Sequence, residues 1–413
     1  MSSSPSAPAQ RPFLDRARGV LDGLRDAGEL KVLQVLDSPM DGRVRLVADD
    51  GSTREALCFC SNNYLGLANH PEVIEAGERG LRDYGAGTAS VRFICGTFSP
   101  HLELEERIAQ FLGVESAYTF VSCWTANEAL FPTLAEPGDY VISDALNHAC
   151  IIDAIRLAAV INKGLNKAVY PNNDLAALDD RLATARAALD KDNPAGVIWV
   201  VTDGVFSMEG SVADLPRMRE LCDRYGAMLV VDDSHGTGVM GETGRGTHEH
   251  FRMPGSSVDV FASTLGKALG GAAGGFLAGP REAIDLIVQR GRPTLFSNAL
   301  PVTVACSASK AIEVLDREPE RVETLRSNVR YARGKIRAAG FEVLDSPTAI
   351  CPVIVHDTAK AIAMSKRLLE LGVYVIGFGY PVVPEGEARL RCQISAAHTR
   401  ADIDELVGAL AKL

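Results

Sequence analysis

The sequence lacks any apolar run of the roughly 20 residues that a membrane-spanning helix requires, which argues against a membrane-embedded protein. It also lacks an excess of positive charge, because 42 Lys and Arg stand against 53 Asp and Glu, a net charge of −11. That balance disfavours nucleic acid or an anionic membrane surface as the main partner. The first residues have no apolar core, so we expect a disordered tail over 1–12 and no secretory signal.

The nine cysteines show no spacing typical of a metal site, and we predict no bound metal. Cys58 and Cys60 are too close together for a CxxC pair. An odd number of cysteines in a chain of 413 residues favours reduced thiols, and therefore a cytoplasmic location.

The order of apolar runs predicts the fold. An amphipathic helix is expected over residues 13–33, followed by two short strands and then by long helices that alternate with short, continuously apolar runs. Such runs are typical of buried strands in a largely parallel sheet covered on both faces. The expected strands are 44–48, 57–60, 117–121, 140–143, 196–202, 227–231, 258–262 and 274–278.

A long helix from about residue 301 leads to a terminal segment with strands near 341–344, 351–355, 373–376 and 389–393. We therefore predict an α/β protein with a central, mostly parallel sheet. Its expected parts are a small N-terminal segment (13–62), an α/β domain (63–300) and a C-terminal α+β domain (301–413).

Polar side chains follow several of these strands at the point where each strand ends. In an open α/β sheet, ligand sites form beyond the carboxyl ends of the strands, so we expect these side chains to surround one site. The residues concerned are Lys267, Asp232, His235, Ser207 and His148.

Lys267 lies among small residues, where desolvation would lower its pKa and make the amine a nucleophile toward an aldehyde. A Gly-Lys pair alone is more often a surface lysine at a helix start. Pyridoxal phosphate (PLP) needs a carboxylate against its pyridine nitrogen, and Asp232 at the end of an apolar strand fits that need. His235 could then hydrogen-bond the phenolic oxygen. Taken alone, Asp232 could equally cap the following helix.

The helix expected after the strand at 117–121 would offer backbone N–H groups to a phosphate. Ser122 and Thr125 could also be ordinary helix caps. His148 could lie over the face of a cofactor ring, although a lone histidine after a strand is more often structural.

Together these segments resemble the α-oxoamine synthases among the fold-type I PLP enzymes, and within them the glycine C-acetyltransferases (2-amino-3-ketobutyrate CoA ligases). The resemblance runs from about residue 59 to 399. It rests on residues 59–70, 89–97, 142–148, 202–208, 231–235, 244–246, 264–271, 295–298, 378–384 and 393–398.

The resemblance implies a role for each matching residue. Lys267 would hold PLP covalently, Asp232 would pair with the pyridine nitrogen, and His235 with the phenolic oxygen. His148 would stack on the ring, with Ser207 beside it. The phosphate would lie among Ser122, Cys123, Trp124 and Thr264, and Ser297 would reach the phosphate of a neighbouring subunit in a homodimer. Asn63 and Arg391 would bind the substrate carboxylate, a role that suits the rigid fork of Arg391.

The implied reaction joins glycine to acetyl-CoA, with Lys267 removing the α-proton of glycine, and releases CoA. Other members of the family use a longer acyl thioester or another amino acid, and some lose the carboxylate as carbon dioxide. A carrier-protein thioester, an aminotransferase and a non-catalytic PLP-binding protein are the remaining alternatives.

Several positions depart from the glycine C-acetyltransferase pattern. They are Thr88, residues 98–100, Trp124, Thr125, Glu128, Ala129 and Gly379. We therefore hypothesise that the acyl donor or the amino acid differs from acetyl-CoA and glycine. A glycine at 379 removes side-chain volume, which could admit a longer acyl chain.

Overall fold

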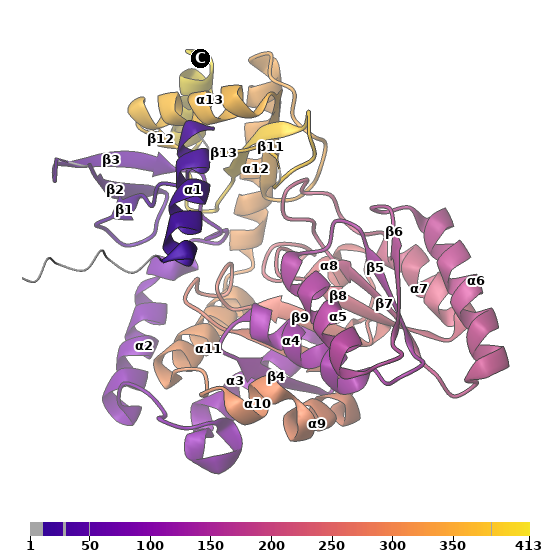
Figure 1. Cartoon of the computed structure of the whole chain (residues 1–413). Coiled ribbons are helices and arrows are strands. Elements are labelled where there is room, and N and C mark those ends of the chain that lie inside the picture. The colour runs from indigo at the N-terminus through magenta and orange to yellow at the C-terminus, as the bar shows by residue number, and fades with distance from the viewer. Residues whose placement is uncertain (1–10, 28–29, 49, 381) are drawn as a thin grey trace, which may run out of the picture.

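The computed structural model describes residues 11–27, 30–48, 50–380 and 382–413 (Figure 1). Of the tail expected over 1–12, residues 1–10 lie outside the described part of the chain. Within the described residues, no helix combines the length and the hydropathy needed to span a membrane.

A seven-stranded sheet forms the centre of the structure, in the order β4-β10-β9-β8-β7-β5-β6 (Figure 1). β10 runs antiparallel to both of its neighbours, whereas the remaining neighbours pair in parallel. The predicted α/β fold with a mostly parallel central sheet is therefore confirmed. The strands are β4 (Ser116–Phe120), β5 (Tyr140–Asp144), β6 (Asn166–Tyr170), β7 (Ile198–Asp203), β8 (Ala227–Asp232), β9 (Val260–Thr264) and β10 (Gly275–Gly279).

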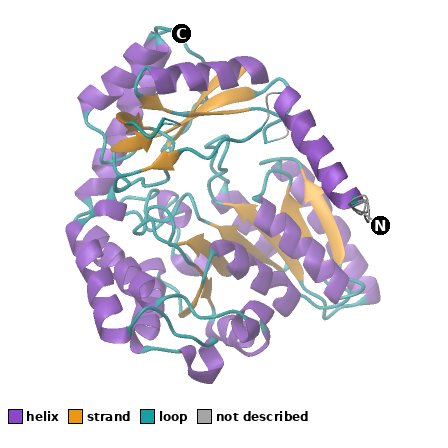
Figure 2. Ribbon diagram, turned by 60° about the vertical axis from the view of Figure 1, so that its left-hand side comes forward, coloured by secondary structure: helices purple, strands orange, loops and turns teal. Residues whose placement is uncertain are grey.

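Both faces of this sheet are buried, which explains the continuously apolar strands. Along β8, Leu229 and Val231 belong to one hydrophobic cluster, while Val230 between them belongs to another. Figure 2 shows helices packed on both sides of the strands. One face carries α4 (Cys123–Leu134), α5 (Ala149–Ile161) and α9 (Arg281–Arg290); the other carries α3 (Ser99–Leu112), α6 (Leu175–Asp192), α7 (Leu215–Tyr225) and α11 (Val302–Arg317).

Strand β6 was not predicted from the sequence. It lies at the edge of the sheet and is only partly buried, so its alternating sequence, Asn-Lys-Ala-Val-Tyr, lacks the continuous apolar run of the inner strands. Three shorter or flanking helices complete this part of the chain: α2 (Pro71–Tyr84), α8 (Thr247–His250) and α10 (Arg292–Phe296).

Two smaller sheets lie beside the large one. One contains β1 (Val35–Leu36), β2 (Arg43–Val47), β3 (Thr53–Cys58) and β12 (Val373–Tyr374); the other contains β11 (Ile350–His356), β13 (Ile376–Phe378) and β14 (Ala388–Gln393). They pack with α12 (Glu320–Ala338), α13 (Thr358–Glu370) and α14 (Arg400–Leu410). Because β12 pairs with β3, strands from both ends of the chain share one sheet. The proposed three-part division of the chain stays a prediction.

Two predicted elements were wrong in extent or kind. The helix expected over 13–33 is α1 (Pro12–Asp26), which has no buried side chain, so no packing within the chain stabilises further turns. The strand expected at 341–344 is reduced to an isolated bridge at Val343. Side chains from α12 take its carbonyls instead, since Arg337 donates to Val343 O and Arg333 to Leu344 O.

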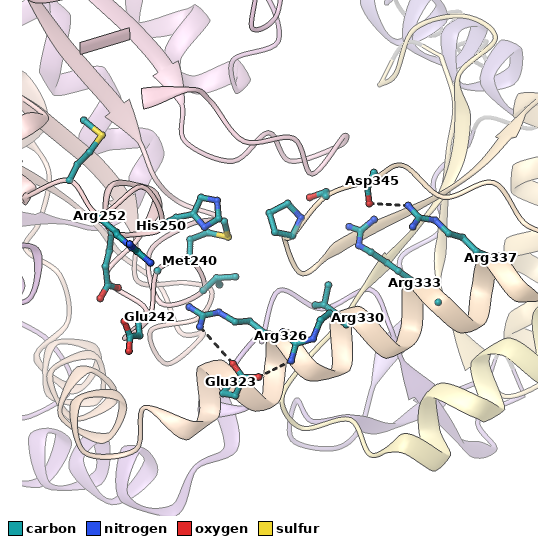
Figure 3. A pocket seen from close by; sticks show the side chains of 18 of the residues that line it. Met240, Glu242, His250, Arg252, Glu323, Arg326, Arg330, Arg333, Arg337 and Asp345 are labelled. Atoms are coloured by element: carbon teal, nitrogen blue, oxygen red, sulfur yellow. Dashed lines mark hydrogen bonds and ion pairs between the residues drawn. The ribbon is translucent and has the colours of Figure 1, made fainter. Parts of the chain in front are cut away.

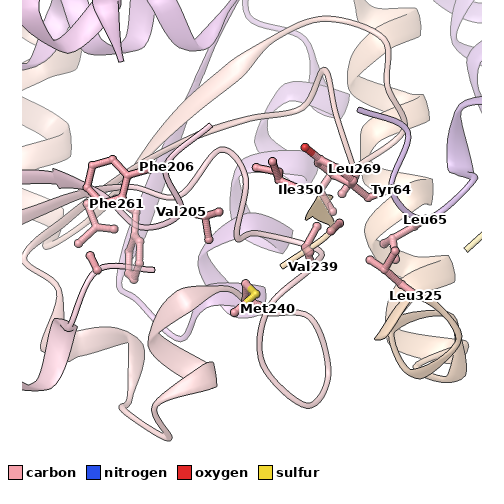
Figure 4. Packing of buried hydrophobic residues seen from close by; sticks show 14 of the residues in the cluster. Tyr64, Leu65, Val205, Phe206, Val239, Met240, Phe261, Leu269, Leu325 and Ile350 are labelled. Atoms are coloured by element: carbon pink, nitrogen blue, oxygen red, sulfur yellow. The ribbon is translucent and has the colours of Figure 1, made fainter. Parts of the chain in front are cut away.

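A single hydrophobic cluster joins the large sheet to the C-terminal elements (Figure 4). Phe206 and Phe261 come from the region of the sheet, Leu325 from α12 and Ile350 from β11. Each is 1% exposed or less. The two regions therefore share one continuous core, which fixes the strand ends of the sheet against the C-terminal segment.

Candidate functional site

A cavity of about 230 Å³ lies at the carboxyl ends of the parallel strands. Asp203 ends β7, Asp232 ends β8 and Thr264 ends β9, and all three line the cavity. The full lining is Cys123, Trp124, His148, Cys150, Asp203, Val205, Asp232, Ser234, His235, Thr264 and Lys267. Of the residues expected to lie together beyond the strand ends, Lys267, Asp232, His235 and His148 line this one cavity. Ser207 and Ser122, which were also expected at the site, are not part of its lining.

Lys267 and His235 are in direct contact in this cavity, with Lys267 Nζ 2.9 Å from His235 Nε2. Burial lowers the pKa of the Lys267 amine, and the nearby Asp232 carboxylate opposes that shift. Burial, reinforced by the charges of Lys267 and Arg391, holds the pKa of His235 well below its usual range, so the ring is neutral. Its Nδ1 lies 2.8 Å from the hydroxyl of Tyr64.

His235 is held at both ring nitrogens, by Lys267 at Nε2 and by the Tyr64 hydroxyl at Nδ1. Because the ring is neutral, it donates a hydrogen bond at one nitrogen and accepts one at the other. The Tyr64 hydroxyl oxygen also lies 3.2 Å from Asn62 Oδ1. Tyr64 was not predicted from the sequence, and its place 171 residues before His235 gave no signal of the contact.

Asp232 is held by three donors. The N–H of Ser234 donates to Oδ1 at 3.0 Å, while the Asn127 amide at 2.8 Å and the Cys123 thiol at 3.6 Å donate to Oδ2. Oδ1 keeps a further lone pair, so Asp232 can still accept a hydrogen bond from a group in the cavity. The arrangement fixes the carboxylate before any ligand binds.

Asn127 is a site residue that the sequence reasoning missed. It is fully buried and also lies 3.3 Å from the thiol of Cys150. A signal for it existed, because Asn127 follows Cys123 by four positions and so shares its face of α4. A buried amide on the face that bears a predicted cofactor ligand needs a polar partner.

Asp203 is the second carboxylate of the cavity, and its strand position pairs directly with that of Asp232. Burial and the charge of Asp232 hold the pKa of Asp203 well above its usual range. Both effects favour the protonated form of Asp203.

His148 begins α5 and caps it with its own ring. Its Nδ1 accepts the N–H of Cys150 at 3.2 Å, and the Cys150 thiol also lies 2.9 Å from Nδ1. Burial lowers the pKa of the His148 ring and raises the pKa of the Cys150 thiol well above its usual range. His148 is thus neutral, with its proton on Nε2, and its ring is fixed in place at the cavity wall.

The first turn of α4 forms another part of the wall. Ser122 caps the helix by accepting the N–H of Thr125 at 3.1 Å, which leaves the N–H groups of Cys123 and Trp124 without intrahelical partners. Gly275 of β10 packs so closely on Cys123 that any Cβ at this position would overlap its backbone. The site needs that glycine to bring α4 against the sheet.

The remaining predicted residues lie outside this lining. Arg391 on β14 donates through Nε to the carbonyl of Ser207 at 2.6 Å. The Asn63 side-chain amide donates to the Met40 carbonyl at 3.2 Å, and its Oδ1 accepts the N–H of Ala68 at 3.1 Å. Ser297 follows α10 on another side of α4, beside Thr125, so it does not reach its own chain's cavity. The roles of all the predicted site residues stay predictions.

The cavity fits PLP in its chemistry. An amine with a lowered pKa, a carboxylate with a free lone pair, and a helix N-terminus lie on its walls. These match the aldehyde, the pyridine nitrogen and the phosphate of PLP respectively. Lys267, Asp232 and the first turn of α4 would hold the group.

The structure does not support the hypothesis that Gly379 makes room for a longer acyl chain. The room left by Gly379 is filled by Thr358, whose side chain would overlap any Cβ added at 379. Gly379 therefore opens no space for a longer acyl chain. Trp124, in contrast, lines the cavity, with its indole N–H bonded to Glu128 at 2.9 Å.

Sequence comparison identifies the family. The aminotransferase class I and II family matches residues 54–410. The chain belongs to this family. The predicted fold-type I, PLP-dependent class is therefore confirmed.

Individual relatives narrow the likeness to the α-oxoamine synthases, as the sequence motifs predicted. The 2-amino-3-ketobutyrate coenzyme A ligase of Salmonella typhimurium is 44% identical over 401 residues, covering 97% of each chain. The 8-amino-7-oxononanoate synthase of Symbiobacterium thermophilum is also 44% identical, over 95% of this chain and 96% of that one. A solved structure of serine palmitoyltransferase (SPT) with a PLP internal aldimine has a TM-score of 0.88 at 30% identity, and the match covers 97% of this chain and 98% of that one.

Proposed function

We propose that this chain is a PLP-dependent acyltransferase that joins glycine to acetyl-CoA, giving 2-amino-3-oxobutanoate and CoA. The observation that carries the proposal is the cavity in which Lys267, with a lowered pKa, lies with the fixed carboxylate of Asp232. The full-length similarity to 2-amino-3-ketobutyrate coenzyme A ligases supports the choice of substrates.

When bound, PLP supplies an electron-accepting ring that stabilises negative charge at a substrate carbon. Asp232 would keep the pyridine nitrogen protonated, and Asn127 and Ser234 hold the Asp232 carboxylate in place for that task. The Lys267 amine takes the α-proton of glycine, because its lowered pKa leaves a larger fraction of it unprotonated. His148 covers the cavity wall as a neutral ring and so adds no competing charge.

Arg391 and Asn63 support the binding of the glycine carboxylate. The Arg391 guanidinium is buried, and its Nε is held by the Ser207 carbonyl, so its fork is fixed in direction. Burial lowers the pKa of Arg391, and a carboxylate beside it would offset the cost of its buried charge.

A homodimer is part of the proposal. Phe93 and Ile94 lie in the short helix η2 (Arg92–Gly96), which contacts α10, where Phe296 ends the helix. These three side chains are 61%, 69% and 74% exposed, and such a patch is typical of a protein interface. Ser297 follows this patch directly, which fits a contribution to the partner's phosphate site. A cytoplasmic location is likewise proposed, with the nine free cysteines in support.

The experiment is an absorbance titration of the purified holoenzyme with single amino acids, followed by a panel of acyl-CoAs with parallel measurement of free thiol. The proposal expects glycine to change the cofactor spectrum and acetyl-CoA to release CoA with the highest kcat/KM. A longer thioester or another amino acid as the preferred substrate would assign a different α-oxoamine synthase activity. Release of pyridoxamine phosphate with an amino acid alone would assign an aminotransferase.

A further inference from the structure

A groove of about 1280 Å³ lies between the loop after β8 and helix α12 (Figure 3). One wall contains Met240, His250 and Arg252, and the other contains arginines of α12. None of the residues that line this groove lines the cofactor cavity. It is therefore a separate feature of the surface.

Four arginines form a row along the groove side of α12, at positions 326, 330, 333 and 337. Spacings of three and four residues place them on one face of the helix (Figure 3). Like charges at these spacings destabilise a helix, so the row needs compensating anions. Arg252 adds a fifth guanidinium from the opposite wall.

The acidic partners of this row are weakly placed. Glu323 bonds Arg330 at 2.7 Å and lies 3.8 Å from Arg326, but its side chain is 60% exposed. Asp345 bonds Arg337 at 3.0 Å and is 92% exposed. Ion pairs so open to water contribute little, and a more highly charged anion could replace them.

Two of the five arginines have no carboxylate partner within the described part of the chain: Arg252 and Arg333. Arg333 is 5% exposed. Its guanidinium donates to the carbonyls of Leu344, Thr348 and Ile350. Its Nε is buried and has no hydrogen-bond partner among the described residues. Of the other carboxylates that line the groove, Glu249 accepts from the backbone and hydroxyl of its own loop, and Glu242 faces the groove from the loop.

We propose that this groove binds a polyphosphate anion, either a nucleoside polyphosphate or an inorganic one. Guanidinium forks match phosphate oxygens in geometry, and a phosphate chain carries enough charge to bridge the α12 row and Arg252. The same groove has apolar lining from Met240, Met253 and Pro347, where a nucleoside base could pack.

The bound anion would tie the loop after β8 to the C-terminal elements. That loop begins at the active site, because His235 contacts Lys267 and Asp233 accepts the N–H and hydroxyl of Thr247 at its far end. Binding is therefore expected to stabilise the folded chain and to raise its Tm progressively as the ligand concentration exceeds Kd.

The test is isothermal titration of the PLP-loaded enzyme with ATP and, separately, with inorganic tripolyphosphate. The expected result is saturable binding of one anion per chain, weakened at least tenfold in an Arg326→Gln, Arg330→Gln double variant and in an Arg252→Gln variant on the opposite wall. Arg321→Gln is the matched control, since Arg321 lies on the same helix but pairs with Glu318 outside the groove. If ATP binds more tightly than tripolyphosphate, the nucleoside base contributes to binding. If the two bind equally, the groove recognises the phosphates alone.

The proposal is overturned if neither anion binds or if both groove variants bind as the parent does. A circular dichroism spectrum and Tm like those of the parent establish that each variant is folded.

Discussion

Lys267 Nζ lies 2.9 Å from His235 Nε2, and the opposite nitrogen of that ring lies 2.8 Å from the Tyr64 hydroxyl. The three side chains come from separate parts of the sequence, yet they form one chain of hydrogen bonds in which His235 lies between Lys267 and Tyr64. Because the ring is neutral and buried, its orientation depends on these two contacts. The position of the Lys267 amine therefore depends on a tyrosine that does not line the cavity.

Replacement of Tyr64 by Phe tests this relationship. The change leaves the aromatic ring in place but removes the hydroxyl partner of His235 Nδ1, a cost of about 1–3 kcal/mol for a buried polar group. We expect kcat/KM to fall roughly 5- to 100-fold and the pH profile of the cofactor absorbance to shift. A purely structural role for Tyr64 predicts a lower Tm with an unchanged pH profile, and that result would refute the assignment.

Replacement of Asn127 by Ala tests the support of Asp232. A charged carboxylate that loses a buried donor is destabilised by about 1.5–3 kcal/mol, so we expect PLP affinity to fall roughly 10- to 100-fold. Equilibrium dialysis of PLP measures it. Asn162→Ala is the matched control, because Asn162 donates to the Ala135 carbonyl at 2.6 Å, away from the cavity. Equal losses of affinity in the two variants would contradict a specific role for Asn127.

His398 predicts how stability depends on pH. Its Nδ1 accepts the Ser395 N–H at 3.1 Å and its Nε2 donates to the Cys58 carbonyl at 3.0 Å, so the ring must be neutral. Burial lowers its pKa from 6.5 to about 4. As the pH falls from 6.5 toward 4, the unfolded chain takes up a proton that the folded chain excludes, and stability is lost.

The expected loss from this residue is at most about 1.4 kcal/mol per pH unit in that window. Urea unfolding at pH 7 and pH 5 measures it, and a His398→Asn variant should show a smaller difference between the two values. His356→Gln is the control, since His356 is largely exposed. The account is wrong if the two variants have the same pH dependence.

The exposed Phe296 predicts a dimer interface. A Phe296→Ser change should shift the enzyme from dimer toward monomer and lower activity, because Ser297 would then leave the partner's site. Light scattering after gel filtration measures the mass. Val169→Ser on edge strand β6 removes a similar exposed side chain, 56% against 74%, and should leave the mass unchanged. A monomeric parent enzyme would contradict the interface.

The sequence predicted the features that depend on local pattern. The inner strands were visible because each is apolar along its whole length, and the residues after them were predictable because parallel strands end at the same edge. Lys267, Asp232 and His235 could thus be placed together without coordinates. Edge strand β6 could not be recognised in this way, since it begins with two polar residues and lacks a continuous apolar run.

Contacts between distant segments could not be predicted in the same way. Nothing local to Tyr64 indicates that it meets His235, and nothing local to Thr358 indicates that it fills the space beside Gly379. The antiparallel direction of β10 and the pairing of β12 with β3 also depend on the path of the whole chain. The hypothesis about the acyl pocket failed at Gly379 because it relied on side-chain volume without knowledge of the neighbour.

The most direct test of the central claim is borohydride reduction of the holoenzyme followed by peptide mass spectrometry. The account predicts one modified peptide, which carries a reduced pyridoxyl phosphate group on Lys267, and no modification in a Lys267→Ala variant. Modification of another lysine, or none in an enzyme that retains bound PLP, would contradict the assignment of Lys267 as the residue that holds the cofactor.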